Sequence, residues 1–161
     1  MNEMYEPSII VRGPREDDLE SLLKLLERYY MFNEEFDPAL EMATDFREKA
    51  MDVLRRRIAG EGLTLLAEQD GRIVGYLYAV IEEDKLLNRG KICIIRELYV
   101  SPESRETGVA SRLISELIRM LDRMDVRHIA AVFPTENYVA ESLYDKLGFR
   151  RHMYIYLREV E

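Results

Sequence analysis

The strongest constraint on the fold is a strand–helix–strand series in the second half of the chain. The run from Lys91 to Val100 is mostly apolar and stops at Ser101-Pro102. Apolar residues then recur at helical spacing from Gly108 to about Met124, and His128 to Phe133 returns to a strand pattern. Two strands joined through a helix pair in parallel, with a right-handed crossover in nearly all cases. The series therefore predicts an α/β fold with a ligand site at the carboxyl ends of these strands.

The N-terminal part of the chain predicts a short strand and two amphipathic helices. Ile9 to Arg12 is β-rich, and apolar residues from Leu19 to Tyr30 recur at steps of three and four. A second helix is predicted over Phe46 to Ile58, where Asp45 and Glu48 have the spacing of a capping box.

Two further strands and a C-terminal helix complete the predicted elements. Leu63 to Gln69 and Arg72 to Ile81 flank Asp70-Gly71, which is a strong signal for an antiparallel hairpin. A last helix is expected near Val139 to Leu147, and Met153 to Leu157 can form a final strand.

Length and charge limit the functional classes. The 161 residues hold no linker, repeat or low-complexity tract, so we expect a single domain over residues 1–161. The net charge of -8 argues against a nucleic-acid partner, because neutralising phosphates requires a basic face. No window approaches the ~20 apolar residues that span a bilayer, and the start is unlike a targeting signal. We therefore expect a cytoplasmic protein without a membrane partner.

Few residues are available for metal or nucleophilic chemistry. Cys93 is the only cysteine and lies in an apolar run, so it forms no internal disulfide and is interpreted as a core thiol. His128 and His152 have neither metal-ligand spacing nor an evident link to Cys93. We expect no metal cofactor.

The junction between the strand ending at Val100 and the helix starting near Gly108 can bind an anion. A helix start has backbone N–H groups without internal partners and a partial positive charge. Gly108 would let a phosphate approach the backbone, although a glycine here equally permits close helix–sheet packing. A nucleotide-binding P-loop or dinucleotide fingerprint needs more glycines than this loop contains.

Two motifs resemble those of the GNAT superfamily of acyl-CoA-dependent N-acyltransferases. The first, Arg105-Glu106-Thr107-Gly108-Val109-Ala110, fits the family pattern Arg/Gln-x-x-Gly-x-Gly/Ala at a helix start. The second spans Asn137 to Phe149 and is similar to the family's Asn, Ala and Tyr-x-x-x-Gly-Phe series. The resemblance covers most of the chain. Glu106 departs from it, because many members have glycine there and a carboxylate would repel a pyrophosphate unless it points to solvent.

The resemblance implies a mixed, mostly antiparallel sheet flanked by helices, with a splayed parallel strand pair at the cofactor site. It also implies an N-acetyltransferase that uses acetyl-CoA as acetyl donor and a primary amine as acceptor, by direct attack. Backbone groups of Leu98, Tyr99 and Val100 would pair with the pantetheine arm, and Asn137 would add a polar contact. Backbone amides would hold the pyrophosphate along the loop Arg105, Glu106, Thr107, Gly108, Val109 and Ala110.

The alternation of side chains along the strand from Lys91 to Val100 gives partial independent support for a ligand site on its backbone. If Ile92, Ile94, Leu98 and Val100 share one apolar face, Arg96 falls on that face as well. A β-bulge near Arg96 would relieve the conflict and free backbone groups for a ligand.

Two side chains are candidates for acid–base catalysis. An alkylamine has a pKa near ~10.4, so a base or water relay must remove its proton, and Glu97 is the candidate. We place Glu97 on the face of Cys93, Ile95 and Tyr99; its alternative role is a structural pair with an arginine. Tyr144 matches the family's acid position, where a phenol protonates the departing thiolate; its alternative role is packing.

The acceptor is a small-molecule amine or a protein amino group, and the sequence does not choose between them. Two acidic clusters, Glu34 to Asp37 and Glu82 to Asp84, are expected to flank its entrance. Three other tyrosines are interpreted as core or pocket walls: Tyr138, Tyr154 and Tyr156. The sequence leaves open a homodimer, and also a non-catalytic module that senses acyl-CoA or contacts a partner.

Overall fold

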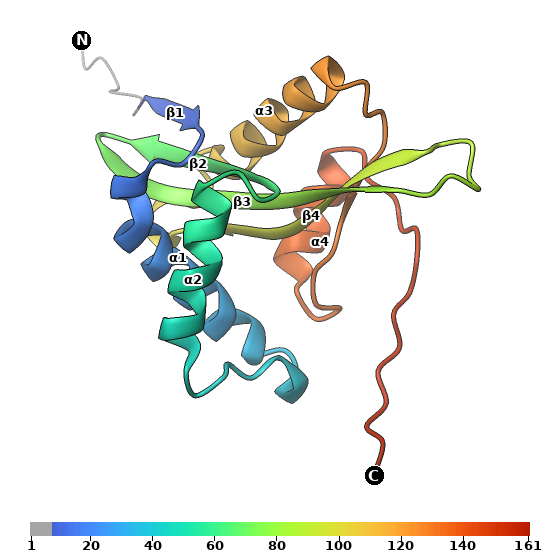
Figure 1. Ribbon diagram of the computed structural model, residues 1–161, viewed down its shortest axis with the longest axis horizontal. Helices are drawn as coiled ribbons and strands as arrows, with labels where there is room; N and C mark the ends of the chain where they lie inside the picture. The colour runs from blue at the N-terminus through green and yellow to red at the C-terminus, as the bar shows by residue number, and fades with distance from the viewer. Residues whose placement is uncertain (1–7) are drawn as a thin grey trace.

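The strand patterns produce one five-stranded sheet whose strands follow chain order (Figure 1). The structure, a computed structural model, describes residues 8–161. Antiparallel pairing joins the first four strands, and the fourth and fifth pair in parallel, as the strand–helix–strand series predicted. The strands are β1 (Ile9–Arg12), β2 (Leu63–Gln69), β3 (Arg72–Glu83), β4 (Lys91–Val100) and β5 (Ile129–Ala131).

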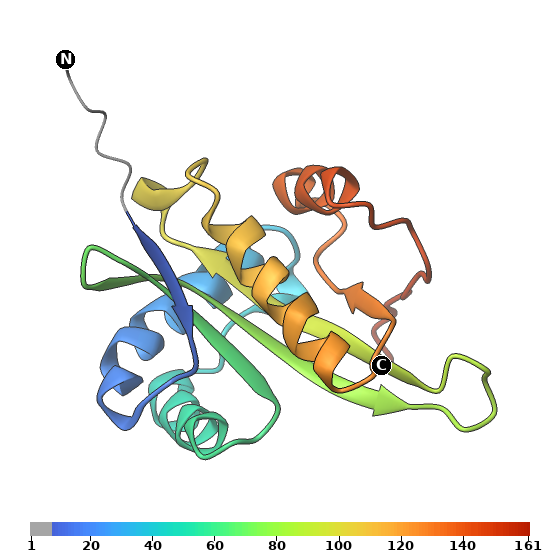
Figure 2. The same ribbon diagram turned by 90° about the horizontal axis from the view of Figure 1, so that it is seen from above.

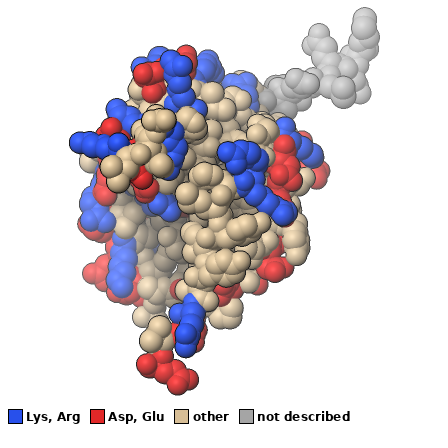
Figure 3. Space-filling view, turned by 90° about the vertical axis from the view of Figure 1, so that its right-hand side faces the viewer, with Lys and Arg blue, Asp and Glu red and all other residues tan. Residues whose placement is uncertain are grey.

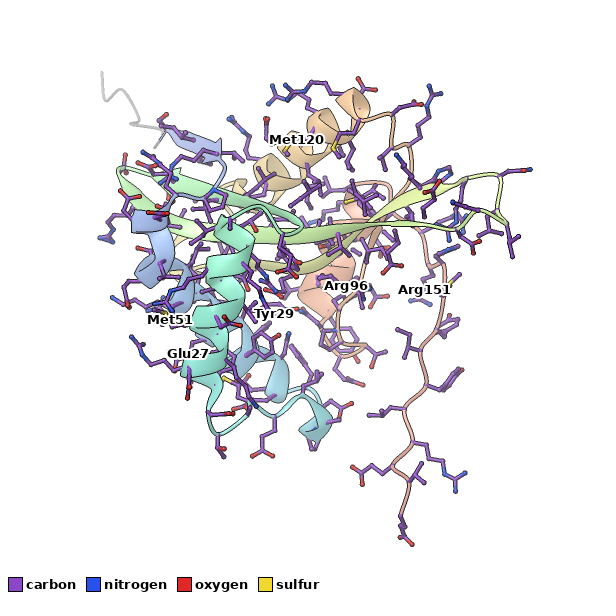
Figure 4. The ribbon with its side chains drawn as sticks, viewed as in Figure 1. Glu27, Tyr29, Met51, Arg96, Met120 and Arg151 are labelled. Carbon is purple, nitrogen blue, oxygen red and sulfur yellow. The ribbon has the colours of Figure 1, made fainter. Side chains whose placement is uncertain are left out.

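Helices cover both faces of the sheet. Figure 2 shows α3 crossing one face, with α1 and α2 on the other. Met51 of α2 and Met120 of α3 accordingly lie on opposite sides (Figure 4). The bounds are α1 (Leu19–Glu34), α2 (Phe46–Ile58), α3 (Val109–Arg123) and α4 (Tyr138–Lys146), with short 3-10 turns η1 (Glu16–Asp18), η2 (Pro38–Leu40) and η3 (Pro102–Ser104).

Two hydrophobic cores result, one on each side of the sheet. The apolar face of α3, centred on Leu113 and Leu117, packs on the sheet together with Cys93 and Ile95. On the opposite side, the leucine stripe of α1 and Leu54 of α2 cover the sheet. Cys93 is fully buried, as expected for a core thiol, and burial raises its pKa to about 11.

A β-bulge at Arg96 divides β4 into two parts of opposite parity. Tyr78 and Ala79 are consecutive in β3, yet they pair with Glu97 and Ile95, so Arg96 is the extra residue. The predicted bulge is confirmed. The face assignments on either side of it were wrong, because the bulge reverses which residues face each core.

The assumed capping box of α2 is absent. Asp45 makes no side-chain cap, and its carboxylate instead lies 3.0 Å from Lys49 one turn further on. The helix ends at Ile58, and Gly60 follows it with a φ of 113° that allows the backbone to turn away while its N–H bonds to the carbonyl of Arg57. The sequence therefore located both ends of α2 correctly but not the way its first turn is satisfied.

The predicted strand over Met153 to Leu157 is also absent. Residues 150–161 have no regular secondary structure and extend away from the sheet (Figure 1). Tyr154 and Tyr156 are exposed, as is Tyr138 of α4, so none of these three tyrosines lies in the core. An isolated strand without a neighbour leaves its backbone groups unpaired, which is why the local pattern alone does not produce a strand here.

Residues 8–161 contain neither a membrane-spanning helix nor a cluster of metal-binding side chains. No helix in that range has the length and apolar character required to cross a membrane. No group of three or more His, Cys, Asp or Glu side chains in that range is arranged to hold a metal ion.

The two faces of α3 give a direct test of the packing. Leu113 is fully buried, whereas Ile118 on the same helix is 48% exposed. Leu113→Ala should lower the free energy of unfolding by about 2–5 kcal/mol, because it leaves a cavity that the core fills only partly. Ile118→Ala should cost less than about 1 kcal/mol. Urea denaturation of both variants measures the difference, and equal losses would contradict the assigned face.

Candidate active site

The edge of β4 beyond its pairing with β5 is open. The pairing ends where Ile95 lies opposite Ala131 and accepts a hydrogen bond from the Val132 N–H at 3.1 Å. β4 continues to Val100, still paired with β3 on its other side. The two parallel strands therefore diverge over the second half of β4.

Register identifies which backbone groups face this open edge. The Ser101 N–H bonds to the Val74 carbonyl on β3 at 2.7 Å. In an antiparallel ladder the residues that bond to the neighbour alternate, so Tyr99 also directs its backbone toward β3. The N–H and C=O groups of Leu98 and Val100 consequently point toward the gap beside β5. Tyr99, predicted with them as a pantetheine contact, contributes no backbone group to this edge.

The start of α3 leaves backbone donors free. Gly108 is the N-cap with φ 84°, and because glycine has no side chain, no side-chain hydrogen bond caps the helix. Apart from the local backbone and the two neighbours of Gly108 in the chain, no atom of residues 8–161 lies within 4 Å of where a Cβ of Gly108 would stand. The first intrahelical bond joins the Arg112 N–H to the Gly108 carbonyl, so the N–H groups of the first turn remain available to an anion.

The loop before α3 is held by its own side chains. Arg105 folds back, and its Nε donates to the Val100 carbonyl at 3.0 Å, while the Thr107 hydroxyl donates to the Ser104 carbonyl at 2.6 Å. Glu106 is exposed and has φ 62°, a left-handed conformation that favours glycine. The departure from the family pattern therefore falls at a strained position, with the carboxylate directed to solvent.

Glu97 lies in a closed hydrogen-bonded pair on the α2 side of the sheet. Its two carboxylate oxygens accept from Arg57 Nη1 at 2.8 Å and Nη2 at 2.7 Å. The Tyr76 hydroxyl donates to Glu97 Oε1 at 3.0 Å, and the guanidinium carbon of Arg57 lies 3.5 Å from the centre of the Tyr78 ring. Both partners are almost fully buried. This is the structural role that the sequence left open.

The pKa values of Tyr76 and Arg57, the two hydrogen-bond partners of Glu97, are both raised. Burial raises the pKa of Tyr76 well above its ordinary value, and the negative charge of Glu97 adds to the effect. Burial alone would lower the pKa of Arg57, but the hydrogen bond and charge of Glu97 raise it. Arg57 is therefore a permanent cation, and Tyr76 keeps its proton.

Tyr144 lies between two aromatic rings near β5. It is 6% exposed, stacks on Phe133 with ring centres 5.3 Å apart, and meets Phe149 edge-on at 5.0 Å. Burial raises the pKa of Tyr144, with a smaller contribution from Tyr29. Its hydroxyl makes no hydrogen bond to another residue of the range 8–161, so it is a protonated donor without an acceptor there.

Tyr29 connects α1 to the bulge in β4. Its hydroxyl donates to the Arg96 carbonyl at 3.0 Å, at the bulge itself (Figure 4). Burial raises the pKa of Tyr29 to about 12, so this hydroxyl also stays protonated. Local sequence patterns do not reveal this contact, because residues 29 and 96 belong to α1 and β4, which lie in different layers.

Asn137 is the N-cap of α4. Its Oδ1 accepts from the Ala140 N–H at 3.1 Å, which fixes the side chain and leaves the amide nitrogen as its free polar group. The cap explains why this residue type begins the helix.

The structure brings some of the predicted residues together and separates others. Leu98, Val100 and the loop residues 105–110 meet where β4 gives way to α3. Glu97 faces the opposite core from Cys93 and Ile95, and no hydrogen bond or ring contact connects it to Tyr144. Sequence reasoning missed Arg57 and Tyr76, because only the packing of α2 over the sheet reveals them.

The two acidic clusters do not lie together. Figures 1 and 2 show the loop between α1 and α2 at one end of the molecule and the tip of the β3–β4 hairpin at another. Several of these carboxylates have local partners: Glu34 accepts from the Met42 N–H, Asp37 from the Ala39 N–H, and Glu82 pairs with Arg96. The two clusters therefore do not form one continuous acidic surface, and their predicted place beside the acceptor entrance stays a prediction.

Sequence comparison places the chain among acetyltransferases. A model of the acetyltransferase (GNAT) family matches residues 19–149. An acetyltransferase of Photorhabdus laumondii subsp. laumondii is 28% identical over 143 residues, which cover 88% of this chain and 87% of the relative.

Solved structures share the fold at low sequence identity. The aminoglycoside N-acetyltransferase AAC(6')-Iy in complex with CoA has a TM-score of 0.77 at 19% identity, covering 97% of both chains. A predicted acetyltransferase from Clostridium acetobutylicum with acetyl-CoA has a TM-score of 0.74 at 17% identity, covering 94% of this chain and 96% of that one. The tetramutant of the BH1408 protein from Bacillus halodurans has a TM-score of 0.82 at 17% sequence identity. The match covers 94% of this chain and 99% of that one.

A double-mutant cycle tests the buried pair. Arg57→Met leaves the Glu97 carboxylate buried without its cation and should lower the free energy of unfolding by about 3–5 kcal/mol. Adding Glu97→Gln removes that charge and should restore part of the loss, measured by urea denaturation. Arg56→Met, on the exposed face of the same helix, should cost no more than about 1 kcal/mol. Additive losses in the double variant would show that the two side chains are not coupled.

Proposed function

The chain belongs to the acetyltransferase (GNAT) family, and we propose that it transfers the acetyl group of acetyl-CoA to a primary amine. The observation that carries the proposal is the open second half of β4 next to the uncapped start of α3. Two structural neighbours are complexes with CoA or acetyl-CoA, which is consistent with a cofactor in the corresponding place.

The proposed cofactor position uses two sets of backbone groups. The pantetheine arm forms a ladder with Leu98 and Val100, in the place that a further strand would take. The pyrophosphate lies on the first turn of α3, where N–H groups and the helix dipole favour negative charge. Residues 105–110 supply this cradle, and Asn137 offers its amide nitrogen from α4. The residues present fit acetyl-CoA as a substrate.

The transfer itself requires two proton movements. The amine nitrogen attacks the thioester carbonyl carbon, the carbon–sulfur bond breaks, and the electron pair leaves with sulfur. Tyr144 gives its proton to the departing thiolate, and this role is supported by a hydroxyl that has no hydrogen-bond partner among residues 8–161 and whose pKa is raised by burial of the residue. Glu97 is the proposed base for the amine proton. Because both of its oxygens are held by Arg57, the proton reaches it through water and not by direct contact.

The acceptor is proposed to be a small-molecule amine or a protein amino group. Two neighbours are named as aminoglycoside N-acetyltransferases in complexes with CoA or a bisubstrate analogue, which supports the first class. Incubation of the purified protein with acetyl-CoA and a mixed amine panel tests the activity, with release of free CoA thiol as the readout and mass spectrometry to identify the product.

One observation favours a second candidate, an acyl-CoA-binding module without turnover. Arg57 binds both oxygens of Glu97 and the Tyr76 hydroxyl donates to one of them, so most of the carboxylate's acceptor positions are occupied and the arrangement is unfavourable for a base. Saturable binding of acetyl-CoA without thiol release from any amine would support the module and reject the enzyme.

Gly108→Asp should weaken acetyl-CoA binding roughly tenfold or more, because it places a side chain and a negative charge at the start of α3. Gly60→Asp is the matched control, since Gly60 also has positive φ, open space around its Cβ position and a place at a helix end. Calorimetric titration of both folded variants isolates the effect at α3 from backbone strain. Equal affinities of the two variants for acetyl-CoA would contradict a pyrophosphate site at the start of α3.

Tyr144→Phe should lower turnover by ~100 to 10,000-fold, the usual contribution of general acid catalysis, while binding of acetyl-CoA stays nearly unchanged. Tyr138→Phe on the same helix is the control, because Tyr138 is 67% exposed and its replacement should not affect the rate. Steady-state kinetics with an identified amine measure both. A Tyr144→Phe protein with wild-type turnover would assign this residue to packing alone, provided that chemistry limits the rate.

A further inference from the structure

Gly75 of β3 lies beneath the junction between β4 and α3. In the ladder it pairs with Val100, the last residue of β4. A Cβ on Gly75 would stand 2.9 Å from the carbonyl oxygen of Tyr99. It would also stand 3.3 Å from Cγ2 of Val100 and from Cγ1 of Val109, the first residue of α3. Even the smallest side chain at this position would therefore displace the backbone of β4 or the start of α3.

Space, and not backbone conformation, requires glycine at this position. Gly75 does not have a positive φ, so its backbone conformation is open to any residue. It is buried in the interior of a strand, where a glycine weakens the pairing and has no side chain to pack. A glycine in such a place marks a close approach of another part of the backbone, and here that part is the end of β4.

The neighbours of Gly75 have little room to yield. Val109 is 2% exposed, and it packs with Val74 and Val100 in the core beneath α3. The Ser101 N–H bonds to the Val74 carbonyl at 2.7 Å and holds the end of β4 on β3. Because protein interiors are close-packed, an added methyl group at Gly75 moves the strand and the helix relative to each other instead of filling a void.

The two proposed contact points for the coenzyme lie on either side of this contact. Leu98 and Val100 offer backbone groups at the open edge of β4, and the free N–H groups of α3 begin just after Gly108. Both points would be occupied by one ligand of fixed covalent length. Contact at one point therefore presents the rest of the ligand to the other point only when the spacing between them is correct.

Charge attraction does not compensate for a misplaced contact point. Coenzyme A carries anionic phosphates, whereas the chain has a net charge of -8. On the face shown in Figure 3, Lys and Arg side chains are interspersed with Asp and Glu. The affinity therefore depends on short-range hydrogen bonds to backbone groups, and these weaken steeply when their geometry is disturbed.

We propose that Gly75 is a positioning residue for the coenzyme, which sets the spacing between the open edge of β4 and the start of α3. It acts through Val100 and Val109 and does not contact the ligand itself. A displaced junction should weaken a ligand that spans both contact points, but not a fragment that occupies only one. The inference rests on the proposed function, because it takes the coenzyme to bind at these two places.

Gly75→Ala should lower the affinity for coenzyme A roughly tenfold, because a displacement by a fraction of an ångström misaligns one set of hydrogen bonds. Pantetheine would occupy only the β4 edge, and inorganic pyrophosphate only the start of α3. Each fragment should bind the variant within about twofold of its wild-type affinity, since neither spans the junction. Calorimetric titration measures coenzyme A, and NMR titration measures the weaker fragments. Gly13→Ala is the matched control, because Gly13 also lacks a positive φ and has open space around its Cβ position.

A loss of stability alone would not separate the coenzyme from its fragments. Leu121→Ala truncates a buried side chain at the other end of α3, so it should lower the urea midpoint and leave the affinity for coenzyme A unchanged. If Gly75→Ala does not fold, Val109→Ile adds a methylene group to the same contact from the α3 side. That variant should likewise lose affinity for coenzyme A and keep it for both fragments.

The outcomes distinguish this inference from the proposed function. Equal affinities of Gly75→Ala and wild type for coenzyme A would show that the junction accepts a side chain, and would overturn the inference alone. A loss of the same size for coenzyme A and for either fragment would indicate local damage to one contact point, and would also overturn it. A wild-type protein without saturable binding of coenzyme A would reject the proposed function, and the inference with it.

Discussion

The rest of the site depends on the bulge at Arg96. Without the extra residue, Glu97 would continue the face of Cys93 and Ile95 and place a carboxylate in the apolar core under α3. With it, Glu97 turns to the α2 side, where Arg57 neutralises it, and the outer edge of β4 passes to Leu98 and Val100. Burying an unpaired carboxylate is far more costly than interrupting one rung of a ladder, so the sequence requires the bulge.

Two consequences of the bulge serve different purposes. On one side of the sheet it completes a buried ion pair, with Tyr76 and Tyr78 surrounding the charges. On the other edge it leaves backbone groups beside a strand that has already diverged, and Tyr29 secures the bulge carbonyl from α1. A rigid, open edge is thereby held next to the uncapped start of α3. Stability and ligand access arise from the same local irregularity.

Local patterns predicted most of the fold and part of the site. The bounds of β4 and α2 followed from apolar periodicity, and the Arg96 conflict predicted the bulge, because both signals are contained in neighbouring residues. The partner of Glu97 was not predictable, since Arg57 meets it only after α2 packs over the sheet. The strand at Met153 to Leu157 failed for a related reason: its pattern was read correctly as strand-like, but a strand also needs a neighbour, and the chain alone supplies none in this position.

We propose that the open edge of β4 and the start of α3 together hold acetyl-CoA. A crystal structure of the protein with coenzyme A is the decisive experiment. We expect pantetheine amides hydrogen-bonded to the backbone of Leu98 and Val100, with the pyrophosphate on the N–H groups that follow Gly108. Coenzyme A bound elsewhere, or a β4 edge occupied by protein in the complex, would contradict it.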